Sequence, residues 1–64
     1  MKRQWLIDKR KSKFRTQADL ALALGVSKQT ISNWEKGVNV PSKTQMMALC
    51  EALKISPKRF YEGE

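Results

Sequence analysis

Histidine is absent from this 64-residue chain, and cysteine occurs once, at Cys50. Structural zinc sites take their ligands mainly from cysteine and histidine, so the usual ligand sets for zinc are excluded and no metal is expected. A single cysteine cannot form an internal disulfide, which favours a reducing compartment. We therefore interpret Cys50 as a small, buried apolar side chain.

Long apolar runs and alternating apolar and polar segments are also missing. A membrane helix needs about 20 consecutive apolar residues, and a signal peptide needs an apolar stretch after its charged start. We therefore expect no contact with membranes and a cytoplasmic, nucleoid-associated protein. Because a half-buried strand alternates apolar and polar residues, no strand is predicted.

Groups that could catalyse a reaction are few. The six Asp and Glu residues are scattered, and the chain has no glycine-rich phosphate loop. No acid, base and nucleophile are therefore expected to converge. A chain of this length buries only about 60 % of its unfolded surface, which leaves no room for a deep cleft. We predict that the protein is not an enzyme, with no cofactor and no small-molecule substrate.

Positive charge is abundant and unevenly placed. Thirteen Lys and Arg against six Asp and Glu give a formal net charge of +7. Most of the excess lies in residues 1–15, where one acid, Asp8, stands among these bases: Lys2, Arg3, Lys9, Arg10, Lys11, Lys13 and Arg15. This asymmetry predicts a surface that meets a polyanion, although a solvated helix face or a basic chain end would also produce it.

Signals for helix ends recur along the chain. Side chains that suit an N-cap stand at Thr16, Ser27, Ser42 and Ser56, and glycines that suit a left-handed C-cap stand at Gly25 and Gly37. We predict an all-α fold, a single domain over residues 1–64 that forms a compact bundle of about five short helices. Their predicted ranges are residues 3–13, 17–24, 28–35, 42–53 and 57–61.

Apolar residues recur at helical spacing within these ranges and predict one core. Its expected members are Leu20, Ala21, Leu24, Ile31, Trp34, Met46, Leu49, Cys50 and Leu53, closed by Trp5, Leu6, Phe14, Ile55 and Phe60. Met46 and Met47 are interpreted as residues that fill gaps. Leu22 lies off the apolar face of its helix, so we expect it to be exposed.

The range 28–35 contains few apolar residues. At about 100° per residue, one arc of about 140° collects Lys28, Gln29, Ser32, Asn33 and Lys36, with Ile31 and Trp34 opposite. The arc has no carboxylate, whereas a solvated surface helix usually mixes Glu with Lys. Amides match the N6 and N7 edge of adenine, and Lys can donate to guanine or to phosphate. The face therefore suits the DNA major groove.

Residues 16–37 resemble the helix-turn-helix of the Cro and phage-repressor family, also called the XRE family. The likeness is carried by the helix-opening Gln17, the small Ala21 at the helix crossing, the turn residue Gly25 and the core anchors Ile31 and Trp34. It extends over about residues 6–61, because WEKG followed by Pro41, Ser42 and a helix that ends in ALKIS matches the family's later pattern. The resemblance implies a lambda-repressor-like fold with its helix-turn-helix at residues 17–36.

The resemblance also implies the roles of individual residues. Base edges would be contacted by Lys28, Gln29, Ser32 and Asn33. Phosphates would be contacted by Gln17 and Ser27 and by the loop after Gly37, which contains Asn39, and the basic residues Lys13, Arg15 and Lys36 would add further phosphate contacts. The family commonly pairs an Arg of its first helix with the Glu of W-E-x-G, which maps onto Arg10 and Glu35.

Two residues depart from the family's pattern. Arg15 and Lys43 stand where apolar residues are usual. Arg15 is the residue before the Thr16 and Gln17 pair, where the family usually has an apolar residue. The register of the first helix therefore stays open, and Lys9 is an alternative partner for Glu35.

The favoured hypothesis is a sequence-specific regulator of transcription that binds double-stranded DNA, of the phage or prophage repressor type. We expect a homodimer on an operator with two-fold symmetry. The chain is either a complete Cro-like protein or the DNA-binding end of a longer repressor. The alternative is a helical protein-interaction module, of the antitoxin or coactivator type, that uses Leu22 and the basic chain end.

Overall fold

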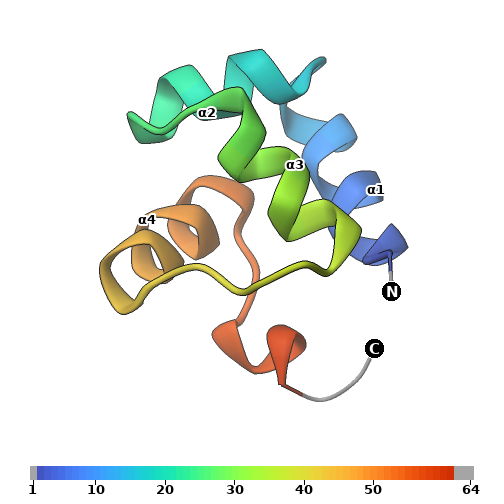
Figure 1. The fold of residues 1–64 in the computed structure, drawn as a ribbon, viewed down its shortest axis with the longest axis vertical. Helices are drawn as coiled ribbons and strands as arrows, with labels where there is room; N and C mark the ends of the chain where they lie inside the picture. Colours follow the sequence, from blue (N-terminus) through green and yellow to red (C-terminus); the bar gives the residue numbers. More distant parts are fainter. Residues whose placement is uncertain (1, 62–64) are drawn as a thin grey trace.

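Within residues 2–61, four α-helices and one 3-10 turn follow one another in a computed structural model (Figure 1). They are α1 (Gln4–Lys13), α2 (Gln17–Leu24), α3 (Lys28–Lys36), α4 (Lys43–Leu53) and η1 (Pro57–Phe60). The structure describes residues 2–61, so the outer limits of the expected 1–64 domain lie outside the described residues. No strand occurs within residues 2–61, and the predicted all-α class is confirmed.

The fifth predicted helix, over residues 57–61, is not an α-helix. Pro57–Phe60 forms a 3-10 turn, in which the Arg59 N–H donates to the Ser56 carbonyl at 3.1 Å. Four residues are too few for the i to i+4 bonds of a stable α-helix, and the tighter i to i+3 bonds suffice for a single turn. The other four predicted ranges differ from the observed helices by no more than one residue at either end.

Local side-chain chemistry sets the ends of these elements. Each predicted N-cap hydroxyl accepts a hydrogen bond from a backbone N–H two or three residues later, and Ser42 forms a full capping box with Gln45. Gly25 and Gly37 end α2 and α3 with φ of 71° and 82°. Lys54 ends α4 in the same left-handed region, with φ of 58°, although no glycine signals it.

The buried side chains form one core. It contains Leu6, Leu20, Ala21, Ile31, Trp34, Met46, Leu49, Cys50, Leu53 and Phe60, with Trp5, Phe14, Leu24, Val26, Ala52 and Ile55 packed against it. The interpretation of Met47 as a gap filler is wrong, because this side chain is 67 % exposed. Met47 follows the buried Met46 by one residue, and a rotation of about 100° turns it to solvent. Leu22 is exposed, as predicted.

The helix that contains few apolar residues, α3, is held between its neighbours. In Figure 1 it crosses the middle of the view, and it packs against both α1 and α2. The link from α2 to α3 is short, and the Val26 N–H donates to the Ala21 carbonyl at 3.0 Å. Ile31 and Trp34 are buried in the core. These two anchors leave the opposite side of α3 facing outward.

Candidate nucleic-acid interface

The outward side of α3 presents short polar side chains and lysines. Lys28, Gln29 and Lys36 are exposed, and Ser32 and Asn33 are half-buried. The helix geometry that buries Ile31 and Trp34 places these five residues together on the other side. The amide, hydroxyl and ammonium groups of this surface can donate hydrogen bonds to the base edges or phosphates of a DNA groove.

Two of these side chains, Gln29 and Asn33, are hydrogen-bonded to each other. Gln29 Nε2 donates to Asn33 Oδ1 at 2.9 Å, across one turn of the helix. The sequence analysis gave both residues as contacts to base edges and did not predict this bond. Their spacing of four residues is the signal that could have shown the contact, because residues at i and i+4 are neighbours on a helix surface.

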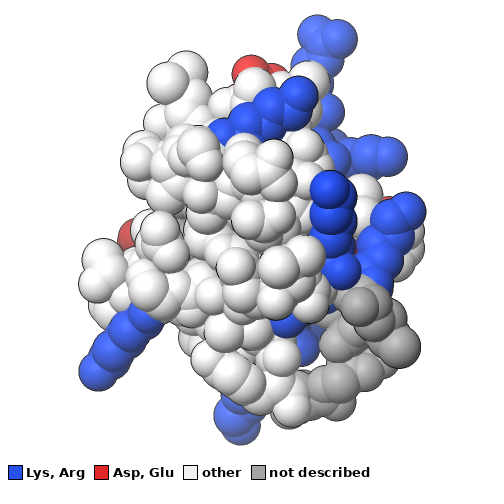
Figure 2. All heavy atoms as spheres, in the orientation of Figure 1, with Lys and Arg blue, Asp and Glu red and all other residues white. Residues whose placement is uncertain are grey.

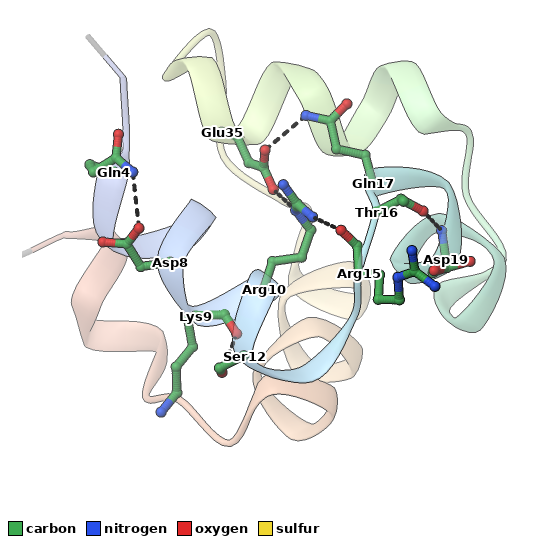
Figure 3. Close-up of polar contacts among 10 residues, drawn as sticks. All are labelled: Gln4, Asp8, Lys9, Arg10, Ser12, Arg15, Thr16, Gln17, Asp19 and Glu35. Carbon is green, nitrogen blue, oxygen red and sulfur yellow. Dashed lines mark hydrogen bonds and ion pairs between the residues drawn. The ribbon is translucent and has the colours of Figure 1, made fainter.

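The one carboxylate of α3 is turned inward. Arg10 Nε lies 2.6 Å from Glu35 Oε2, and both side chains are more than nine-tenths buried. Figure 3 shows this ion pair between α1 and α3, with the Lys9 side chain pointing away from it. Arg10 is therefore the partner of Glu35 in the structure, and the alternative pairing with Lys9 is not formed. The opposite charge of Arg10 reduces the repulsion that Glu35 would exert on a phosphate backbone.

The second oxygen of Glu35 holds the start of α2. Gln17 Nε2 donates to Glu35 Oε1 at 2.8 Å, and a terminal guanidinium nitrogen of Arg10 donates to the Arg15 carbonyl at 3.3 Å (Figure 3). One buried pair thus ties together α1, the α1–α2 connection, α2 and α3. Because an amide nitrogen carries two hydrogens, Gln17 retains one N–H for another acceptor.

The remaining phosphate candidates lie on several elements. Lys13 is the last residue of α1, Arg15 lies in the α1–α2 connection, and Lys36 is the last residue of α3; all three are exposed. The Ser27 hydroxyl accepts from the Thr30 N–H at 3.1 Å and shares a hydrogen bond with the Thr30 hydroxyl at 2.8 Å, so its hydrogen is free for a phosphate when Thr30 is the donor in that shared bond.

Arg3 holds the end of α3, a role that the sequence reading missed. A terminal guanidinium nitrogen of Arg3 donates to the carbonyls of Trp34 at 2.6 Å and Asn39 at 2.9 Å, and the Arg3 N–H donates to the Glu35 carbonyl at 2.7 Å. A cation at the last carbonyls of a helix is favourable. The Arg3 guanidinium also lies 5.2 Å from the centre of the Phe60 ring. Arg3 therefore orients both α3 and the candidate phosphate-contacting residue Asn39.

Charge is distributed toward the edges in the face that Figure 2 presents. Lys and Arg side chains stand mainly around its margin, uncharged atoms fill most of its centre, and only small acidic areas are visible. Residues 2–61 contain no detected pocket and no cluster of three or more potential metal ligands. Within the same range, every helix is too short or too polar to span a bilayer.

Comparison with known proteins agrees with this geometry. The sequence model of a helix-turn-helix family matches residues 6–60. The chain is 39 % identical over 56 residues to the HTH-type transcriptional regulator DicA of Escherichia coli (strain K12), an alignment that covers 88 % of this chain and 42 % of DicA. No solved structure matches the chain. The match over residues 6–60 includes all of α2, the turn and α3, and the chain belongs to the Cro and phage-repressor (XRE) family of helix-turn-helix domains.

Proposed function

We propose that this chain is a sequence-specific binder of double-stranded DNA and acts in transcription regulation, as a repressor of the phage or prophage type. In this proposal α3 enters the major groove and α2 crosses the DNA backbone. The observation that carries it is the outward side of α3, whose polar and basic groups are free of carboxylates because Glu35 is buried against Arg10.

The candidate contact residues then divide into two groups. Lys28, Gln29, Ser32 and Asn33 read base edges. The phosphates are contacted by Gln17, Ser27, Lys13, Arg15, Lys36 and Asn39. Phosphate contacts set the position of the domain on the duplex, and base contacts supply the sequence preference. The fixed position of Gln17 beside Glu35 supports this division, since it places a free N–H at the start of α2.

Regulation by this chain would require a second copy. One domain of this size contacts few base pairs, so we propose a homodimer on an operator with two-fold symmetry. The curated relative DicA is named a transcriptional regulator, and the alignment spans 42 % of its length. Binding to chromosomal DNA would place the protein at the nucleoid, in the cytoplasm.

Selection from a random duplex library tests the proposal. We expect the protein to enrich one motif after several rounds and to bind it at least about 10³-fold more tightly than random DNA. Enrichment of no motif, with equal affinity for selected and random duplexes at several salt concentrations, would overturn sequence-specific binding.

A second function, a protein-interaction module of the antitoxin or coactivator type, is favoured by one observation. Leu22 on α2 has a large apolar side chain that is 84 % exposed and does not belong to the core. Leu22→Lys should abolish binding of a protein partner in this case. If the same variant leaves the selected DNA motif unchanged, the two functions use different surfaces.

A further inference from the structure

The bond between Gln29 and Asn33 limits what each amide can offer to DNA. Gln29 Nε2 uses one hydrogen on Asn33 Oδ1, at 2.9 Å. The atoms left free are Gln29 Oε1 with one N–H, and both N–H groups of Asn33. We propose that Asn33 locks the Gln29 amide and that the locked pair reads a specific base step. The inference rests on the proposed DNA binding and names the sequence element that this site recognises.

Gln29 in this orientation matches adenine. Its free oxygen can accept from adenine N6, and its free N–H can donate to adenine N7. An unrestrained amide could rotate and offer its two groups in the opposite order. The bond to Asn33 restricts that rotation, because it is made only while Nε2 is turned toward the C-terminal neighbour on the helix.

Asn33 in the same pair offers mainly donors outward, because one lone pair of its Oδ1 accepts from Gln29 and both of its N–H groups are free. Guanine presents two major-groove acceptors, O6 and N7, and is the best match, whereas cytosine presents the N4 donor and is the worst. Four residues of helix advance about 6 Å, which corresponds to one or two base-pair steps of about 3.4 Å. The recognised element is therefore adenine with guanine one or two positions away on the strand that Asn33 contacts or on its complement.

The environment of the two side chains supports a lock that Asn33 controls. Asn33 is half-buried and Gln29 is exposed. The backbone of Asn33 is also fixed, because its carbonyl accepts from the Val38 N–H at 3.0 Å and from the Gly37 N–H at the end of α3. The more restricted residue therefore orients the freer one, and less side-chain freedom remains to be lost when DNA binds.

Two variants of Asn33 separate reading from locking. Asn33→Asp keeps an oxygen for Gln29 Nε2 but replaces the outward donors with an acceptor. Selection with this variant should retain adenine and replace guanine with cytosine, whose N4 group donates. Asn33→Ala removes the lock. We expect the preference for adenine over the other bases to fall by at least about fivefold, which is the smallest discrimination expected from one bidentate contact.

The measurement is the ratio of affinities between duplexes that differ at one base pair. A ratio is needed because the carboxylate of Asn33→Asp repels phosphate and weakens binding to every duplex. Thermal unfolding of both variants checks that α3 is intact. Leu22→Ala, which changes an exposed residue of α2, is the control and should leave both ratios as they are in the original protein.

The outcomes distinguish this inference from the proposed function. If the original protein selects no motif, DNA reading by α3 fails altogether. If it selects a motif but Asn33→Ala keeps the full adenine preference, the lock is overturned and sequence-specific binding stands. Loss of both preferences in Asn33→Asp, or loss of neither, also overturns the locked pair, because the proposal requires the guanine preference to change and the adenine preference to persist.

Discussion

At the residue scale, a buried ion pair keeps a carboxylate away from the candidate DNA surface. Glu35 would place a carboxylate beside the candidate DNA surface, and it is instead buried with Arg10 at 2.6 Å. The sequence raised Arg10 and Lys9 as alternative partners. Only packing separates them, because the side chains of consecutive helix residues point about 100° apart.

Removal of either partner of this pair should destabilise the domain. Arg10→Ala strands the buried carboxylate, and Glu35→Ala strands the guanidinium, so each should cost about 3–5 kcal/mol of unfolding free energy. Urea unfolding of both single variants and the double variant measures the coupling. Lys9→Ala is the matched control from the same helix and should change stability by no more than about 0.5 kcal/mol. An absence of coupling would contradict the contact.

Cys50 should make stability depend on alkaline pH. Burial raises the pKa of the Cys50 thiol above its ordinary value of 9.0. The folded protein then holds this proton more tightly than the unfolded chain, so its contribution is complete below about pH 9 and is lost as the pH rises through the folded pKa. Between about pH 8 and about pH 10, the unfolding free energy should fall less in Cys50→Ala than in the original protein. An equal fall in both would contradict this assignment.

At the element scale, short helices depend on how they begin and end. α2, α3 and α4 each begin at a hydroxyl N-cap, and α2 and α3 end at glycine. Lys54 is the exception, because it ends α4 with a positive φ of 58°. A side chain with a Cβ is strained in this region, whereas glycine adopts it freely.

Lys54→Gly should therefore stabilise the protein. The relief of left-handed strain exceeds the added entropy of the unfolded chain, and we expect a gain of about 0.5–1 kcal/mol. Ala48→Gly introduces the same residue at an exposed position inside α4, where φ is helical, and should instead cost about 1 kcal/mol. Thermal and urea unfolding compare the two. If both substitutions destabilise the protein, the strain at Lys54 is not significant.

At the scale of the whole molecule, the net positive charge and the polar side of α3 make different contributions to the proposed DNA binding. The formal net charge of +7 favours binding to any polyanion. The polar side of α3 supplies the groups that could distinguish DNA sequences. These two contributions respond differently to salt and to base sequence. They can therefore be separated by paired substitutions.

Lys13→Ala and Gln29→Ala form such a pair. Lys13 offers a point charge, so its loss should weaken binding to selected and random DNA alike and lower the slope of log K against log salt by about one. Gln29 offers an amide, so its loss should cost about 1–3 kcal/mol on the selected motif and little on random DNA. Titrations at several salt concentrations measure both. Equal weakening of all sequences by Gln29→Ala would argue against α3 as the reader.

The spacing of half-sites tests the proposed homodimer on DNA. We expect two half-sites about one helical turn apart, so that two copies lie on the same side of the duplex. Insertion of about five base pairs between them rotates one copy by half a turn and should abolish cooperative binding, and insertion of about ten should restore the shared side. Footprints would reveal both effects. Protection of a single isolated half-site at saturating protein would contradict a two-copy complex.

Much of the fold could be predicted because its signals are local. An N-cap such as Thr16 acts on a backbone N–H three residues away, and Gly25 acts on the turn that contains it. The core followed from helical spacing in the same way. Met47 was misjudged because its composition suits the core, whereas its position on α4 turns it outward.

Most helix boundaries, the hydroxyl and glycine caps and most of the core follow from signals in the sequence, since each of these signals acts within about one or two helical turns. The family resemblance rests on the order of such signals over about residues 6–61. Contacts between groups that lie far apart in the sequence depend on tertiary packing. Gln17 reaches Glu35 across 18 positions, and Arg3 reaches Trp34 across 31 and Asn39 across 36. No periodicity links such residues, because their contact depends on how helices cross once the core has formed. That packing turns Glu35 inward beside Arg10 and leaves the amides of α3 outside.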